Sequence, residues 1–133
     1  LKGALALFGA RLAGSTPEYC ILVGLAVTVG HNWPVQLGFR GGKGLATSFG
    51  AVLVFDPILA GAMLALCGLL ILVTRRFTLS ACVPYLLSPA LSLACGHSGA
   101  VAALLLPLVA AVVAPHHENL RAELHRRHAA LSS

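Results

Sequence analysis

Charged residues are scarce in this sequence, and acidic ones scarcest: four of the 133 residues are Asp or Glu, and nine are Lys or Arg. Charged residues make up 10% of the chain and hydrophobic residues 58%, whereas roughly 25% of the residues of an ordinary soluble domain are charged. So few charged residues cannot cover the surface of a soluble domain. The composition therefore argues against a water-soluble fold and indicates a membrane protein.

Paired cysteine motifs are missing as well. The chain contains no CxxC pair, and each of its cysteines lies in an apolar run, where a small buried thiol is ordinary: Cys20, Cys67, Cys82 and Cys95. We therefore expect neither a disulfide nor a metal site. The net charge of +5 does not indicate a nucleic-acid partner, because the basic residues are scattered between apolar runs.

Long uncharged runs are what the sequence has instead. Residues 77–115 contain no Asp, Glu, Lys or Arg, and a helix needs about 20 apolar residues to cross the hydrocarbon core, so this run can cross twice. We predict an all-α fold, a polytopic transmembrane helix bundle that forms one domain over residues 1–133. Its six expected membrane segments are residues 1–13, 19–30, 45–55, 57–74, 78–95 and 98–114.

The basic residues fall on one side of the membrane if each segment crosses once. Every Lys and Arg except Arg11 then lies on the side that holds residue 2, residues 31–43, residues 75–76 and the tail from residue 116. Loops rich in Lys and Arg stay in the cytoplasm, so we predict that this side is cytoplasmic and that Glu18 and Asp56 lie opposite. Segment 45–55 rises only about 16 Å, and we expect it to be tilted or partly submerged beside a water-filled cavity.

The most informative stretch is residues 30–47, which read GHNWPVQLGFRGGKGLAT. Its glycines allow the backbone to approach an anion closely, and residues 45–47 can begin a helix whose free N–H groups point back at that anion. We therefore predict a phosphate site at Gly41, Gly42, Lys43 and Gly44. A plainer interpretation is a glycine-rich turn whose Arg40 and Lys43 only enforce membrane orientation.

A second polar cluster, HHENLR at residues 116–121, follows the last apolar segment. It places imidazole and amide groups on the predicted side of Lys43, where a shared site can hold a doubly charged substrate. The plainer interpretation, which we prefer beyond Leu124, is an amphipathic helix on the membrane surface. The loop at Arg75 and Arg76 is by default a determinant of topology, and with Thr78 it can add a phosphate contact.

These motifs resemble the PlsY family, bacterial membrane acyltransferases that move a fatty acyl group from acyl phosphate to glycerol 3-phosphate. Residues 30–47 are similar to that family's second motif, GHxFPxxxxFxGGKGxAT, with Trp33 in place of Phe. This match is long and specific. It implies a multi-pass protein of the bacterial cell membrane, with its active site on the cytoplasmic side and membrane lipids around it.

Two further segments carry the resemblance. His116 with Asn119 is similar to the third motif, HxxNIxR, although Ala122 stands where the Arg is expected and Arg121 lies one place early. Residues 74–79, TRRFTL, are similar to the family's TRxxSL segment, with Thr78 for Ser.

The resemblance implies a reaction that yields 1-acyl-glycerol 3-phosphate and inorganic phosphate without a cofactor. It implies that His116 and Asn119 are catalytic, aligning the hydroxyl or stabilising charge on the acyl oxygen. No Ser-His-Asp arrangement can be read in the sequence, which favours direct attack by the glycerol hydroxyl over an acyl-enzyme. The implied substrate-binding residues are His31, Gly41, Gly42, Lys43, Gly44, Thr47, Arg75 and Thr78.

Lys2 and Gly3 resemble the DxxKG start of the family's second membrane helix, so the resemblance covers about the C-terminal two-thirds of the family's length. We expect the first helix and the first motif, a Ser-Gly-Asn-rich loop, to be absent from this chain. The chain is then either a fragment or a shortened relative, and alone it should have little or no acyltransferase activity. A non-catalytic relative and a small transporter component are the alternatives, although the segments hold no ionisable group in mid-membrane.

Overall fold

The structure is a computed structural model that describes residues 2–34, 38 and 41–123. All regular elements in these ranges are helices: α1 (Lys2–Leu12), α2 (Pro17–Asn32), α3 (Leu45–Phe55), α4 (Pro57–Thr74), α5 (Phe77–Ala94), α6 (Gly99–Val113) and the short 3-10 helix η2 (Ala114–His116). The chain then continues as a helix to Glu123. The predicted all-α bundle of six segments is confirmed. The amphipathic helix predicted beyond Leu124, and Arg40, lie outside the described residues.

Polar caps set the starts of three helices, because the first N–H groups of a helix need partners from outside it. Side-chain oxygens accept hydrogen bonds from the new helix in each case: Thr16 from the N–H of Tyr19 at 3.3 Å, Asp56 from Ile58 at 2.7 Å, and Ser98 from Val101 at 3.3 Å. Helix α2 (Pro17–Asn32) extends beyond the predicted segment 19–30 at both ends. His31, which we had placed in the following loop, is helical.

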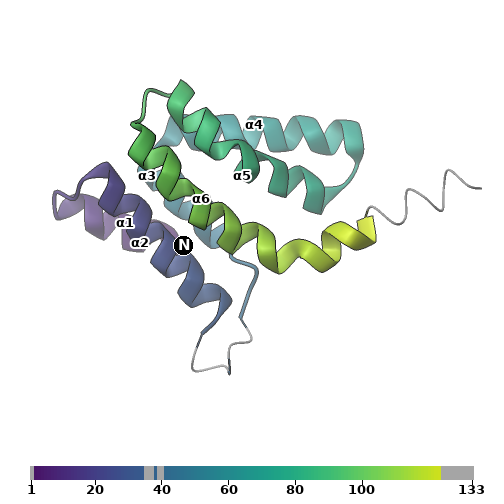
Figure 1. Cartoon of the computed structure of the whole chain (residues 1–133), viewed down its shortest axis with the longest axis horizontal. Helices are drawn as coiled ribbons and strands as arrows, with labels where there is room; N and C mark the ends of the chain where they lie inside the picture. The colour runs from purple at the N-terminus through teal and green to yellow at the C-terminus, as the bar shows by residue number, and fades with distance from the viewer. Residues whose placement is uncertain (1, 35–37, 39–40, 124–133) are drawn as a thin grey trace, which may run out of the picture.

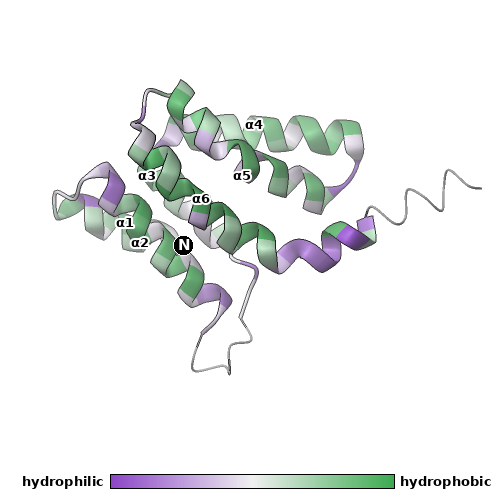
Figure 2. Cartoon of the chain, in the orientation of Figure 1, coloured by the Kyte–Doolittle hydropathy of each residue, from purple (hydrophilic) through white to green (hydrophobic). Residues whose placement is uncertain are grey.

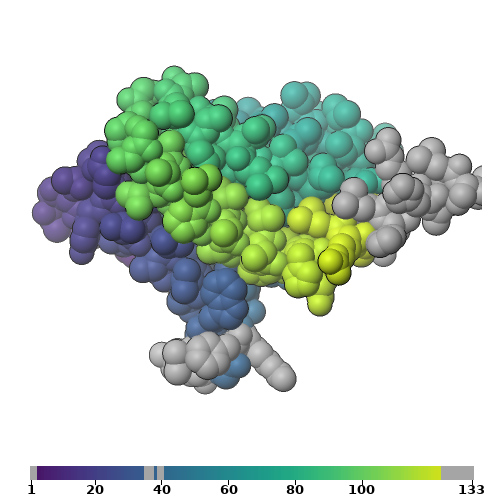
Figure 3. Space-filling model, viewed as in Figure 1, coloured from purple at the N-terminus to yellow at the C-terminus, as the bar shows by residue number. Residues whose placement is uncertain are grey.

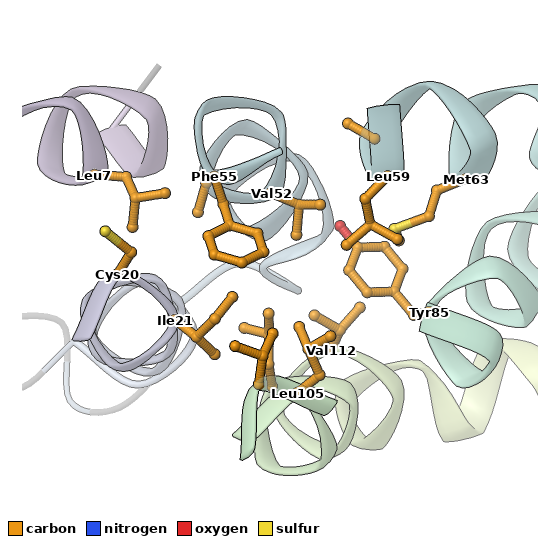
Figure 4. Packing of buried hydrophobic residues seen from close by; sticks show 14 residues of the cluster. Leu7, Cys20, Ile21, Val52, Phe55, Leu59, Met63, Tyr85, Leu105 and Val112 are labelled. Atoms are coloured by element: carbon orange, nitrogen blue, oxygen red, sulfur yellow. The ribbon is translucent and has the colours of Figure 1, made fainter. Parts of the chain in front are cut away.

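Helix α3 lies at the centre of the bundle although it has only 11 residues. It contacts α1, α2, α4 and α6. Figure 4 shows its side chains Val52 and Phe55 among Leu7, Ile21 and Leu105 from three other helices. Because protein surrounds it, the backbone of α3 need not span the lipid by itself.

Three helical stretches are long and apolar enough to cross a membrane alone, within the part of the chain that the structure describes. They are Pro57–Thr74, Phe77–Ala94 and Gly99–Glu123, whereas Gly3–Leu12 and Leu45–Phe55 are shorter apolar helices. The expected shortness of the third segment is therefore confirmed, and the helices that are long enough to cross alone all lie in the second half of the described chain.

Close packing of α1 on α3 explains an early glycine. A Cβ on Gly3 would overlap the carbonyl oxygen of Thr47. Small residues allow helix backbones to approach in this way. Thr47, which we had predicted to bind substrate, is 8% exposed, and its main-chain carbonyl takes part in this contact.

Helix α6 joins the two halves of the bundle. It packs on α2 on one side and on α5 on the other, and it runs between the α1–α2 and α4–α5 pairs in Figures 1 and 3. Figure 2 shows hydrophilic residues at the end of α2, at the α4–α5 turn and on the extension beyond α6, with apolar residues along the helices between. This is the distribution of a bundle whose middle lies in lipid.

The far end of the bundle is held by polar contacts between its turns. Asp56 Oδ2 lies 2.8 Å from His97 Nε2, which ties the α3–α4 turn to the α5–α6 turn. The ring of His97 also lies 4.9 Å from that of Phe55, and Arg11 donates to the carbonyl of Val54 at 2.9 Å. This end therefore has its charges engaged within the protein.

The Asp56 contact predicts how stability depends on pH. Burial raises the pKa of Asp56, but hydrogen bonds from His97 and from the N–H groups of Ile58 and Leu59 together lower it below its ordinary value. A carboxyl with a lowered folded-state pKa stabilises the fold above its unfolded pKa of about 4, and this stabilisation is lost as pH falls through the folded value. We expect Asp56→Asn to lower the melting temperature in detergent at neutral pH.

The difference in melting temperature between wild type and Asp56→Asn should shrink between about pH 5 and about pH 3. Glu18→Gln is the control, because Glu18 is partly exposed and accepts a single weak hydrogen bond, from Ser98 at 3.3 Å. A difference for Asp56→Asn that stays constant over this range would contradict the assignment.

Candidate active site

A cavity of about 530 Å³ opens where α2 ends and the chain beyond α6 begins. Its lining combines both polar clusters of the sequence: Asn32, Trp33, Gly41, Gly42, Lys43, Ala114, Pro115 and His117. The glycine motif and the tail therefore meet at one end of the bundle, as the charge pattern predicted.

The glycine turn is held by hydrogen bonds to the end of α2. The Gly41 N–H donates to the carbonyl of Asn32, and the Gly42 N–H to that of His31, both at 3.2 Å. The last carbonyls of a helix have no partner within it, and here the turn supplies two donors. These two amides therefore serve the fold of the turn, and the predicted phosphate site depends on other donors.

Steric crowding explains why these two positions are glycine. A Cβ on Gly41 would overlap the carbonyl of His31 and lie 2.5 Å from Pro34 Cδ, and one on Gly42 would overlap the His31 ring. His31 is thus the support of the turn, and it lies outside the cavity lining.

The start of α3 provides the remaining part of an anion site. Gly44 adopts a left-handed conformation, with φ at 69°, and precedes α3 as its N-cap. In the described residues no side chain caps this helix, so the N–H groups of its first turn are directed back toward Lys43, whose side chain is exposed. A helix N-terminus beside a cation favours an anionic ligand.

The two tail histidines have defined ring orientations. His116 is 7% exposed, and its Nδ1 lies 2.7 Å from the carbonyl of Val112. His117 is exposed, and its Nδ1 lies 2.9 Å from the carbonyl of Ala114. Because a carbonyl only accepts, Nδ1 carries the hydrogen in each ring, and Nε2 of the neutral imidazole is left as an acceptor. Each ring can take a proton through Nε2.

The predicted site residues are not all brought together. Gly41, Gly42 and Lys43 line the cavity, whereas the others lie outside its lining: His31, Gly44, Thr47, Arg75, Thr78, His116 and Asn119. His116 is buried directly before the lining residue His117, and Asn119 is exposed on the helical extension. Arg75 ends α4 in an exposed, left-handed conformation.

The start of α5 is occupied by a carboxylate of the chain itself. Glu123 accepts hydrogen bonds from the N–H groups of Thr78 at 3.0 Å and Leu79 at 3.1 Å. An acidic group is favourable at a helix N-terminus, and here it docks the extension beyond α6 on α5. Thr78, which we had considered for a phosphate contact, therefore has its N–H engaged by Glu123.

Sequence reasoning missed three residues that shape this end of the bundle. Asn32 falls at an unspecified position of the glycine motif, and His117 adjoins the histidine that the third motif selects. Glu123 contacts α5 over a long separation in sequence. Its only signal is that it is one of two carboxylates in a tail rich in Arg and His.

Comparison with known proteins decides the family. A family model described as glycerol-3-phosphate acyltransferase matches residues 1–126. The chain belongs to this family. It is 39% identical over 129 residues to glycerol-3-phosphate acyltransferase 1 of Desulfitobacterium hafniense, covering 95% of this chain and 62% of that protein. It is 36% identical over 121 residues to glycerol-3-phosphate acyltransferase 1 of Deinococcus radiodurans, covering 91% and 61%.

Two crystal structures of PlsY, an integral membrane glycerol 3-phosphate acyltransferase, have the same fold. The glycerol 3-phosphate form has a TM-score of 0.80 at 27% identity, covering 92% of this chain and 61% of that chain. The lysophosphatidic acid form has a TM-score of 0.82 at 26% identity, covering 94% and 64%. The resemblance to the PlsY family is thus confirmed, and the chain spans less than two thirds of the length of these relatives.

The family's glycine turn predicts a specific intolerance at Gly44. In Gly44→Ala a left-handed φ costs about 1–2 kcal/mol, and the new Cβ would lie 2.5 Å from Asn32 Oδ1 and 2.9 Å from Thr28 Cγ2. We expect the melting temperature in detergent to fall. Gly68→Ala in α4 is the matched control, because a Cβ there meets nothing within 4 Å and Ala is the better helix former. Equal melting temperatures for the two variants would contradict this role of Gly44.

Proposed function

We propose that this chain forms the membrane-embedded domain of an enzyme that transfers a fatty acyl group from acyl phosphate to the 1-hydroxyl of glycerol 3-phosphate. The products are lysophosphatidate and inorganic phosphate. The observation that carries the proposal is the cavity that joins the glycine turn and Lys43 to the tail histidine His117. The names of the relatives, and the glycerol 3-phosphate and lysophosphatidic acid forms of PlsY, support it.

Lys43 and the first turn of α3 are the proposed phosphate site. Glycerol 3-phosphate carries a dianionic group, which an ammonium and a helix N-terminus stabilise together. Gly41 and Gly42 add no side chain to the cavity wall, so the phosphate can approach the backbone closely. We keep Arg75 as a proposed further cation at the same end of the bundle, where it can attract the anionic substrates without lining the cavity.

The proposed chemical step is a substitution at the acyl carbon. The 1-hydroxyl oxygen of glycerol 3-phosphate bonds to that carbon, the bond from the carbon to the phosphate oxygen breaks, and inorganic phosphate leaves. The hydroxyl proton passes to the Nε2 of a tail histidine, His116 by its motif or His117 by its place in the cavity lining. Asn119 is proposed to align the hydroxyl or to stabilise charge on the acyl oxygen.

An apolar cavity suits the acyl chain of the donor. It has a volume of about 320 Å³ and lies between α3, α4 and α5, where Leu45, Phe49, Met63 and Tyr85 are among its lining residues. Leu45 is two residues beyond Lys43, so the apolar cavity begins close to the proposed phosphate site. We propose that the charged end of the bundle faces the cytoplasm of a bacterial cell, following the distribution of Lys and Arg.

The test is an acyl-transfer assay in detergent or liposomes that measures phosphate release and lysophosphatidate formation. Because the chain covers 62% of the Desulfitobacterium relative, it is assayed alone and joined to the part of that relative that precedes the matched region. We expect little or no activity alone and activity that depends on acyl phosphate when joined. A joined protein that uses only another acyl donor would contradict the proposed donor.

Lys43→Ala in the joined protein should raise the KM for glycerol 3-phosphate by about tenfold or more, with a smaller effect on kcat. A hydrogen bond to a charged group contributes about 1.5–3 kcal/mol, and phosphate binding acts on ground and transition states alike. Lys43→Arg keeps the positive charge and should retain most of the affinity. A KM that is indifferent to Lys43→Ala would remove Lys43 from the site.

His116→Ala and Asn119→Ala should each lower kcat by about a hundredfold, more than they raise KM, if these groups serve the reacting atoms. His117→Ala is the comparison, because His117 lines the cavity whereas His116 is buried. A larger loss of kcat in His117→Ala than in His116→Ala would reassign the base to His117. Unchanged kcat in all three variants would refute the tail as the catalytic element.

A further inference from the structure

The side chain of Asn32 uses only one of its two polar atoms. Asn32 is the last residue of α2 and is 4% exposed. Its Nδ2 donates to the carbonyl of Ala111 on α6 at 2.6 Å. Its Oδ1 is the one buried side-chain nitrogen or oxygen of the described residues that has no hydrogen-bond partner. Because the Ala111 carbonyl only accepts, Nδ2 must face it, and turning the amide over cannot provide a partner for Oδ1.

An unpartnered buried acceptor is costly and therefore needs an explanation. A connection between α2 and α6 requires only the donor of Asn32 and leaves its acceptor unexplained. Asn32 also lines the cavity that contains Lys43 and His117, and its main-chain carbonyl holds the glycine turn through Gly41. The unused acceptor therefore belongs to a residue in the wall of the proposed substrate site.

The chemistry of the proposed substrate identifies a donor for this oxygen. Dianionic glycerol 3-phosphate has two hydrogen-bond donors, its hydroxyl groups, because the phosphate only accepts. The 1-hydroxyl must give its proton to a base as the ester bond forms, so it is directed to a histidine Nε2. The secondary hydroxyl keeps its proton and is the one donor left.

We propose that Asn32 selects the substrate by accepting a hydrogen bond from the secondary hydroxyl of glycerol 3-phosphate at Oδ1. This inference rests on the proposed function and extends it from phosphate recognition to recognition of the glycerol. Oδ1 lies against Gly44, where an added Cβ would be only 2.5 Å away. Binding at Oδ1 therefore requires the glycine turn to move off Asn32 when the substrate enters.

The test compares two ligands that differ only in the secondary hydroxyl, glycerol 3-phosphate and 3-hydroxypropyl phosphate. Affinity for the 133-residue chain is measured in detergent from the rise in melting temperature with ligand concentration. We expect wild type to bind glycerol 3-phosphate about tenfold more tightly, as the loss of one buried hydrogen bond implies. Because this readout needs no turnover, it is independent of acyl transfer.

Two variants at Asn32 separate the acceptor from the donor. Asn32→Asp keeps a side-chain oxygen and loses the donor to Ala111, so the preference for glycerol 3-phosphate should persist while the protein melts at a lower temperature. Asn32→Leu loses both the acceptor and the donor, so the ratio of its affinities for glycerol 3-phosphate and 3-hydroxypropyl phosphate should fall to about one. Thr28→Val is the matched control, since Thr28 is buried one turn earlier beside Gly44 and its hydroxyl is bonded within α2 to the Gly24 carbonyl.

Wild type that binds both phosphates equally would overturn the proposal, and this result does not depend on whether the variants fold. A preference that persists in Asn32→Leu, or that falls equally in Thr28→Val, would also overturn it. If wild type prefers glycerol 3-phosphate through Asn32 but the joined protein transfers no acyl group, the selection stands and the proposed reaction fails. If neither ligand stabilises the chain, both proposals fail.

Discussion

The last turn of α2 is the constraint on which this end of the protein depends. A helix that ends near lipid must find partners for its final carbonyls within the protein, and the carbonyls of His31 and Asn32 find them in the N–H groups of Gly42 and Gly41. The Asn32 side chain simultaneously holds α6 through the Ala111 carbonyl. The glycine turn and α6 are therefore both held by two consecutive residues of α2.

The glycine motif consequently has two different parts. Gly41 and Gly42 are glycines because His31 and the α2 carbonyls lie against them, and their amides are used in folding the turn. Lys43 and the first turn of α3 form the proposed phosphate-binding part. One half of a motif that resembles a phosphate loop in sequence therefore serves the fold, and its proposed ligand-binding half lies at the N-terminus of α3, which contacts four other helices.

Long apolar runs were sufficient to predict the helices, and the distribution of Lys and Arg was sufficient to predict that the glycine motif and the tail meet. The choice between His116 and His117 was not predictable, because the 3-10 helix η2 (Ala114–His116) ends at His116 and interrupts the α-helical geometry directly before His117. A 3-10 helix turns further per residue than an α-helix, so the face of each histidine depends on where that tightening occurs. The Glu123 cap was equally hidden, since a contact between distant segments leaves no local pattern.

The two ends of the bundle differ in how their charges are used. At the far end Asp56 pairs with His97 and Glu18 accepts from Ser98, so those groups stabilise the turns. At the cavity end no carboxylate of the described residues pairs with Lys43, and its charge remains exposed. An exposed cation attracts anions over some distance but is screened by water and salt. Such a cation suits a site whose proposed substrates and products all carry phosphate, because it favours entry of the substrates without retaining the product.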